Sequence, residues 1–146
     1  MIDNFKLTED LVQFKDGFDS WEQAIIDCAK PLVDGEFIND NYVVAMIESV
    51  KEYGPYIVIA PNIAMPHARP EAGSKKVGFS VTVSKKAVSF GTSPEHDARL
   101  LVTLSCVSAD THLLMLQALV GVLADEEKFE AILNATKKEE ILALFN

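Results

Sequence analysis

Residues 99–108, R-L-L-V-T-L-S-C-V-S, decide the fold class of this chain. No charged residue follows Arg99 within the stretch, and its centre is nearly all apolar. A strand of this kind is typical of the middle of a sheet that is covered on both faces. Helical patterns occur at both ends of the chain and strand patterns lie between them. The sequence therefore predicts an α/β domain with helices on both faces of a mixed sheet.

The other strands are read from short runs of β-branched or alternating residues. The stretch V-G-F-S-V-T-V-S at 77–84 alternates apolar with small or polar residues and predicts a half-buried strand. Pro70 and Gly73 break the polar segment 67–76, which predicts a loop. Further extended segments are expected at 11–16, 56–60 and 62–67, and residues 87–91 are expected to close a turn.

Five helices are predicted from apolar residues repeating every three or four positions behind a capping residue. The first is the clearest, because Ser20 and Gln23 form a capping-box pattern before a continuous apolar stripe. Gly54 is expected to end the second helix. The expected first caps of the remaining helices are Asp40, Asp110, Asp125 and Thr136, the last paired with Glu139.

Size and composition place the chain among ordinary globular proteins. Its 146 residues suit one domain, 1–146, with a substantial core. No apolar run approaches the ~20 residues that cross a bilayer, and the acidic, mixed N-terminal segment does not resemble a signal peptide. We expect a cytoplasmic protein with no direct membrane insertion.

The net charge of −9 is unevenly distributed. Residues 1–40 carry −7, residues 41–100 carry +2 and residues 101–146 carry −4. Nucleic-acid binding needs clustered Lys and Arg, so the acidic ends argue against a nucleic-acid partner. They suit a basic protein partner, although charges of this kind also serve only to keep a protein in solution.

The segment around His67 is the best candidate for chemistry. It reads A-P-N-I-A-M-P-H-A-R-P-E at 60–71. Pro66 fixes its own φ and restricts Met65 to extended geometry, so the histidine is held on a stiff support. A neutral imidazole is a nucleophile near neutral pH. The spacing alone also fits an ordinary surface histidine in a proline-bounded turn, which is the commoner case because single histidines are rarely catalytic.

Two more histidines and two cysteines need an interpretation. His112 stands at a predicted helix start, where free N–H groups favour an anion, or where the residue simply faces solvent. His96 lies between two acids and is expected to be exposed. Cys28, on an apolar helix face, and Cys106, within the apolar strand, are expected to be buried and inert.

Several kinds of site are not expected. The three histidines are too widely spaced for a zinc site, so no metal is predicted. The chain has no P-loop, G-x-G-x-x-G or G-x-S-x-G motif, so no nucleotide or other cofactor is predicted.

Three segments together resemble the enzyme IIA family of the mannitol/fructose type, from bacterial sugar phosphotransferase systems. They are IVIAPNIAMPHARPE, then VSFG, then DTHLLMLQALVGVLADEEKFEAIL. YGPYIVIAP and PHARPE most resemble the ascorbate-specific branch. The resemblance covers essentially the whole chain and implies a three-layer α/β/α sandwich with a mixed central sheet.

The resemblance also implies a function. His67 is expected to accept a phosphoryl group from phosphorylated HPr and pass it to a cysteine of an enzyme IIB, which serves a membrane IIC permease that takes up ascorbate or a related sugar. His112 matches the second family histidine, which helps to hold the phosphoryl group. Asn62 replaces the usual glycine, and Lys51 occupies the position of the mannitol-type arginine. Arg69 is the nearest guanidinium in sequence and the expected phosphoryl-binding residue.

Two other functions share this resemblance. A regulatory relative would use the same histidine as a switch that changes its protein partners. A non-phosphorylated domain of the same fold occurs in anion-transporter cytoplasmic regions, and the presence of both His67 and His112 argues against it. The discriminating observation is the presence of a IIB acceptor and a membrane component.

Overall fold

The apolar stretch forms the strand β5 (Asp97–Ser105), which is an interior strand of a five-stranded sheet in the computed structural model. The structure describes residues 6–146. The strands follow the order β1-β4-β5-β3-β2, where β1 is Val12–Lys15, β2 is Val58–Ala60, β3 is Asn62–Ala64 and β4 is Gly78–Ser89. β4 runs parallel to β1 and antiparallel to β5, while β3 runs parallel to β5 and antiparallel to β2. The predicted mixed sheet is confirmed.

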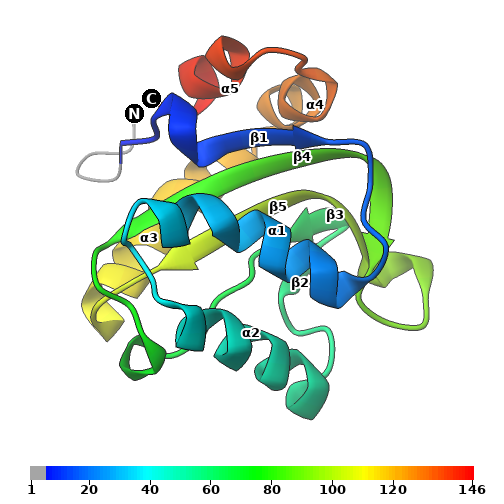
Figure 1. The fold of residues 1–146 in the computed structure, drawn as a ribbon. Coiled ribbons are helices and arrows are strands. Elements are labelled where there is room, and N and C mark those ends of the chain that lie inside the picture. Colours follow the sequence, from blue (N-terminus) through cyan, green and yellow to red (C-terminus); the bar gives the residue numbers. More distant parts are fainter. Residues whose placement is uncertain (1–5) are drawn as a thin grey trace.

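Helices cover both faces of this sheet (Figure 1). α1 (Trp21–Asp34) and α2 (Asp40–Tyr53) lie on one side, in front in the view of Figure 1. α3 (Ala109–Leu123) lies behind the sheet, and α4 (Glu126–Asn134) and α5 (Lys138–Phe145) follow beside β1. Three short 3₁₀ turns, Glu9–Leu11, Pro70–Ala72 and Pro94–His96, connect these elements. The three-layer α/β/α sandwich is confirmed.

The prediction of a half-buried strand at 77–84 was wrong, because residues 78–84 of β4 are buried on both faces. Phe79 packs against Phe145 of α5, with ring centroids 5.7 Å apart. Its neighbour Ser80 points to the opposite face and donates to the carbonyl of Cys28 in α1, at 3.0 Å. Both faces are therefore covered. The hydroxyls of Ser80, Thr82 and Ser84 all hydrogen-bond to other parts of the protein instead of meeting solvent. β4 also continues past an irregularity between Val83 and Val88 to Ser89, where a turn was predicted.

Two of the predicted helix caps are confirmed by hydrogen bonds. The Ser20 hydroxyl accepts from the backbone N–H of Gln23 at 3.1 Å. Asp125 accepts from the backbone N–H of Lys128, also at 3.1 Å. The reciprocal half of the first capping box is not formed, because the Gln23 side chain donates to Asp27 instead. Gly54 ends α2 with φ 83°, a conformation that suits glycine.

Three predicted helix starts are displaced. Asn39 caps α2 in place of Asp40, and Ser108 caps α3 in place of Asp110. In both cases the capping residue has an extended backbone and its side-chain oxygen accepts the third N–H of the helix, leaving the neighbouring acid inside the first turn. Thr136 does not cap α5, which begins two residues later.

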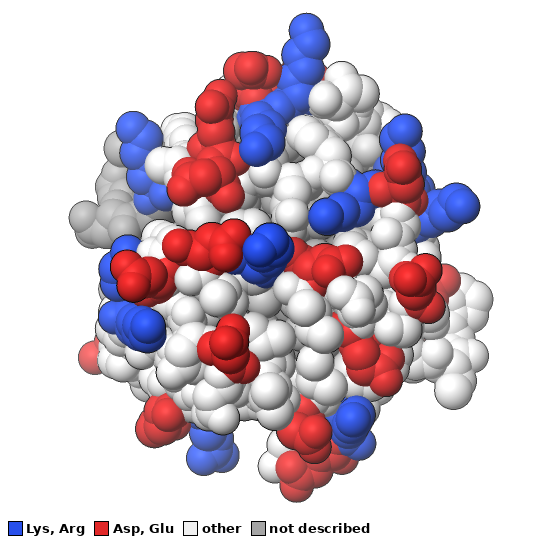
Figure 2. Space-filling view, in the orientation of Figure 1, with Lys and Arg blue, Asp and Glu red and all other residues white. Residues whose placement is uncertain are grey.

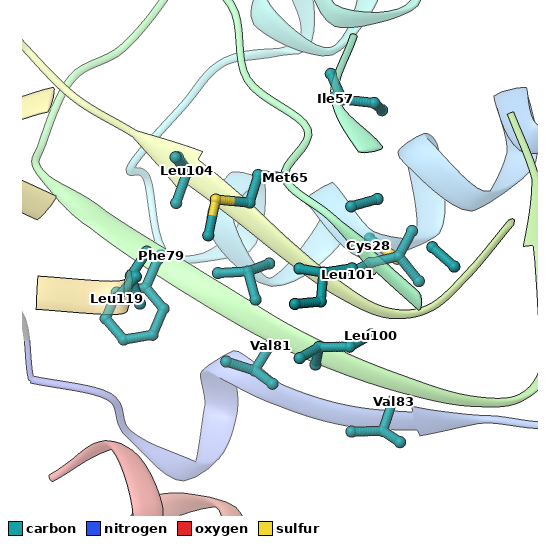
Figure 3. Packing of buried hydrophobic residues seen from close by; sticks show 14 of the residues in the cluster. Cys28, Ile57, Met65, Phe79, Val81, Val83, Leu100, Leu101, Leu104 and Leu119 are labelled. Atoms are coloured by element: carbon teal, nitrogen blue, oxygen red, sulfur yellow. The ribbon is translucent and has the colours of Figure 1, made fainter. Parts of the chain in front are cut away.

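The core lies on both sides of β4 and β5, as the side chains in Figure 3 show. Cys28 is fully buried there, and burial raises the pKa of its thiol to about 12. Cys106 is also buried, with a pKa raised to about 11 by desolvation, but it follows the end of β5 instead of lying within it. Both thiols are protonated at neutral pH, as expected of inert cysteines.

The face of the protein shown in Figure 2 reflects the net negative charge of the chain. On the face shown in Figure 2, acidic residues are spread widely and basic residues stand singly or in small groups among them. None of the helices in residues 6–146 has the length and apolar content needed to cross a bilayer.

Candidate functional site

The segment after β3 brings His67 to the end of the sheet on a rigid support. The backbone N–H of Met65 donates to the carbonyl of Ile57 at 2.8 Å, and the N–H of Leu104 donates to the carbonyl of Pro66 at 3.0 Å. Met65 and Pro66 are buried, and Figure 3 shows the Met65 side chain among core residues. Hydrogen bonds on both sides therefore hold the extended chain in place up to His67. This agrees with the stiff support that Pro66 predicted.

The imidazole of His67 has a fixed orientation. Its Nδ1 lies 2.7 Å from the carbonyl oxygen of Met65. A carbonyl only accepts hydrogen bonds, so Nδ1 carries the proton and donates it. The lone pair of the neutral ring is therefore on Nε2. The ring is partly exposed, so this nitrogen is available to a partner.

His112 lies beside His67, although 45 positions separate them in the chain. Their ring centroids are 5.2 Å apart, and the ring planes are tilted by 41°. Desolvation, followed by the nearby His67, lowers the pKa of His112 below its ordinary value. Its imidazole is therefore neutral at neutral pH, and it can donate one hydrogen bond without adding a full charge.

The start of α3 holds His112 in place. Ser108 and Thr111 form a complete capping box, in which each side chain bonds the other residue's backbone N–H. The backbone N–H of His112 donates to the Ser108 carbonyl at 3.1 Å, so this residue offers its ring and not a free amide. The preceding N–H groups, of Ala109 and Asp110, belong to the first turn and have no intrahelical acceptor.

Both histidines line an open cavity of about 480 Å³. Its wall includes Tyr56, His67, Arg69, Cys106, Ser108 and His112. The structure therefore brings Arg69 to the same cavity as the histidines, with its side chain exposed. Lys51 does not line it among the described residues. Lys51 is exposed on α2, and its Nζ lies 3.9 Å from Oε1 of Glu48.

Two tyrosines at the site were missed from the sequence. Tyr42 of α2 is buried; its hydroxyl donates to the carbonyl of Leu104 at 2.7 Å and accepts from the N–H of Ala68 at 3.0 Å. Burial raises its pKa to about 12. Tyr56 donates from its hydroxyl to the carbonyl of His67 at 3.2 Å. The only available signal was general, namely that buried tyrosine hydroxyls need a partner.

His96 does not belong to this cavity. The expectation that it is exposed was wrong, because its side chain is only 29% exposed. Its Nδ1 lies 3.3 Å from the hydroxyl of Ser93, and its ring fills the space beside Gly91, where a Cβ would clash. The 3₁₀ turn Pro94–His96 folds the ring back onto the chain. Within residues 6–146, no group of three or more His, Cys, Asp or Glu side chains is arranged to hold a metal ion.

Known proteins share this sequence and fold. Residues 5–146 match the family described as "Phosphoenolpyruvate-dependent sugar phosphotransferase system, EIIA 2". The mannitol-specific cryptic phosphotransferase enzyme IIA component of Escherichia coli K12 is 39% identical over 83% of this chain and 82% of its own length. The ascorbate-specific EIIA component of the same strain is 34% identical over 88% of this chain and 84% of its own length.

Solved structures agree with these relatives. The solution structure of the mannitol-specific cryptic enzyme IIA from Escherichia coli is 33% identical and superposes with a TM-score of 0.88, covering 99% of this chain and 97% of that one. A complex of mannitol enzyme IIA with phosphorylated enzyme IIB from Escherichia coli is 26% identical, with a TM-score of 0.86, and 97% of each chain is covered. This chain belongs to the type 2 enzyme IIA family of the phosphoenolpyruvate-dependent sugar phosphotransferase system, whose members are phosphocarriers.

Proposed function

We propose that Nε2 of His67 accepts a phosphoryl group from phosphorylated HPr and passes it to a cysteine of an enzyme IIB. One observation carries this proposal: the 2.7 Å contact between Nδ1 of His67 and the Met65 carbonyl. That contact leaves the lone pair on the nitrogen that is free to react. A nucleophile with a fixed tautomer and orientation needs little reorganisation before it attacks.

The transfer is an in-line displacement at phosphorus. The Nε2 lone pair forms the new P–N bond while the P–N bond of the donor breaks and its electron pair returns to the donor imidazole. Phosphorylation at Nε2 makes the ring of His67 cationic, because Nδ1 keeps its proton. The Met65 carbonyl, which accepts that proton's hydrogen bond, stabilises the developing positive charge. In the second step a cysteine thiolate of the IIB attacks the same phosphorus, and Nε2 is the leaving group.

The surrounding groups suit the equatorial oxygens of the phosphoryl group. Catalysis of phosphoryl transfer rests mainly on positioning and on stabilising charge at those oxygens. The neutral His112 imidazole can donate one hydrogen bond, and the exposed Arg69 guanidinium can turn toward the cavity that both residues line. We propose Arg69, and not Lys51, as the cationic group, because Lys51 lies outside the cavity wall formed by the described residues.

The proposed partners are phosphorylated HPr and a IIB protein in the cytoplasm, with a IIC permease reached through the IIB. A related enzyme IIA has been solved in complex with a phosphorylated IIB. Relatives of mannitol and of ascorbate specificity match at similar identity, so the identities do not separate the two sugars. We propose ascorbate from the PHARPE segment at 66–71, with mannitol as the alternative.

Incubation with enzyme I, HPr and phosphoenolpyruvate, followed by intact-mass measurement, tests the acceptor. The wild type should gain one phosphoryl group and His67→Ala none, while both keep the same circular dichroism, since His67 is partly exposed and contributes little packing. Normal phosphorylation of His67→Ala would refute the assignment. Adding ascorbate-type or mannitol-type IIB then shows which acceptor discharges the protein.

The same assay separates the two candidate cations. Arg69→Ala should slow uptake by about 10-fold or more, as expected for loss of a charge-assisted hydrogen bond. Lys51→Ala should remain close to the wild-type rate. The opposite ranking would move the cationic role to α2.

A further inference from the structure

Tyr56 occupies a tightly constrained turn between α2 and β2. Its backbone N–H donates to the carbonyl of Gly54 at 2.9 Å, and the N–H of Val58 donates to the carbonyl of Pro55 at 3.1 Å. Gly54 has φ 83°, and Pro55 fixes its own φ. The turn therefore fixes the direction in which the Cα–Cβ bond of Tyr56 leaves the main chain.

From this turn the side chain contacts His67 in two ways. The hydroxyl donates to the His67 carbonyl at 3.2 Å. The ring meets the imidazole edge-on, with centroids 5.5 Å apart and planes at 82°. This geometry is the favourable T-shaped arrangement of aromatic rings.

Burial raises the pKa of the Tyr56 phenol. The phenol is therefore protonated at neutral pH and remains a hydrogen-bond donor to the His67 carbonyl.

We propose that Tyr56 is a positioning residue for phosphoryl transfer, which anchors the His67 carbonyl through its hydroxyl and holds the imidazole against rotation through its ring, so that the imidazole keeps the orientation in which Nδ1 bonds the Met65 carbonyl and Nε2 is free to react. The inference rests on His67 being the phosphoacceptor. Tyr56 does not itself contact the phosphorus. It restricts the two motions that would turn Nε2 away, namely displacement of the backbone and rotation of the ring.

Two substitutions separate the two contacts. Tyr56→Phe removes the hydroxyl and keeps the ring, so phosphoryl transfer from phosphorylated HPr should slow by about fivefold, the effect of one ordinary hydrogen bond. Tyr56→Leu removes both contacts and should slow transfer by about 100-fold, the scale of a 1 Å misplacement of a reacting group. Tyr53→Phe is the matched control. Tyr53 is 68% exposed, lines the same cavity and meets the Tyr56 ring edge-on, with centroids 6.4 Å apart. Tyr53→Phe keeps this ring contact and removes a neighbouring hydroxyl, so it isolates the loss of the hydroxyl that bonds the His67 carbonyl.

Imidazole ¹⁵N NMR of the unphosphorylated proteins supplies a readout that a merely structural role would not move. The wild type and Tyr53→Phe should show His67 as a single tautomer with the proton on Nδ1. Tyr56→Leu should show exchange-averaged signals from a mixture of tautomers. A thermal melt checks that each variant is folded, and Tyr56→Phe preserves the ring packing if Tyr56→Leu is unstable.

The outcomes are distinguishable. If Tyr56→Phe and Tyr56→Leu both transfer within twofold of the wild type and keep a single His67 tautomer, the positioning role is refuted. If the wild type itself takes up no phosphoryl group, the proposed function fails, whereas the NMR comparison still shows whether Tyr56 orders His67. Slower transfer with an altered tautomer signal in the Tyr56 variants alone supports the proposal.

Discussion

Tyr42→Phe is expected to destabilise the protein and to loosen the site together. The substitution removes one hydroxyl, which donates to the Leu104 carbonyl at 2.7 Å and accepts from the Ala68 N–H at 3.0 Å. In a strand, the N–H and C=O of one residue point to the same edge. The Leu104 N–H donates to the Pro66 carbonyl. The Leu104 carbonyl therefore also faces the segment that carries His67, and not β4.

The cost follows from the two groups left without a partner. Leu104 is fully buried, so its carbonyl would pay about 1–3 kcal/mol for being unpaired. Ala68 is only partly buried, and water can replace part of its bond. We expect a loss of about 2–3 kcal/mol in the free energy of unfolding. For a chain of this length that corresponds to a fall in Tm of about 5–10 °C.

Urea unfolding followed by circular dichroism measures this difference. The transition midpoint should fall while the slope stays unchanged, because the fold and the surface exposed on unfolding are the same. Tyr53→Phe removes an exposed hydroxyl and should change stability by less than about 0.5 kcal/mol. Should Tyr42→Phe match that control, the paired hydrogen bonds do not hold the site to the core.

Three further predictions concern the histidines and cysteines. His112→Ala should still accept a phosphoryl group on His67 but transfer it about 10²–10³ times more slowly, and rapid-quench rates equal to the wild type in both directions would leave His112 without a role. Because burial lowers the pKa of His112, the native state prefers its neutral form, so its contribution is present above the ordinary value of 6.5 and is lost as pH falls through the lower folded value. Urea midpoints from pH 7 to 5 should therefore fall more in the wild type than in His112→Ala, and parallel profiles would contradict this. The double variant of Cys28 and Cys106 to Ser should lose stability but keep phosphate uptake, whereas thiol-linked phosphate in the wild type would point to an acceptor cysteine.

Local patterns in the sequence predicted the fold class and most of the elements. The apolar run at 99–108 predicted an interior strand, and the proline beside His67 predicted a stiff support; both are confirmed by the hydrogen bonds that pin them. The errors arose where burial depends on distant elements. The hydroxyl residues of β4 have the sequence pattern of a solvent-exposed face, but Ser80 is covered by α1 and donates to the Cys28 carbonyl.

The site was predictable only in part for the same reason. Resemblance paired His67 with His112, and the structure brings their rings together. The tautomer of His67 depends on a backbone carbonyl, which no residue type reveals. The contacts of Tyr42 and Tyr56 depend on where α2 and the following turn meet the end of β3, which is a tertiary property.

The group that fixes the tautomer of His67 is a main-chain carbonyl, that of Met65, so the tautomer should tolerate side-chain substitutions at position 65. A carbonyl is present at every position of a chain, so no side-chain replacement at position 65 deletes the group that sets the proton on Nδ1. Substitutions there can alter the core, but the choice of reactive nitrogen is inherited from the path of the main chain. Pro66 is the residue whose substitution should affect the tautomer. A more flexible residue there would let the Met65 carbonyl rotate away from Nδ1, and the proton of His67 could then occupy either ring nitrogen.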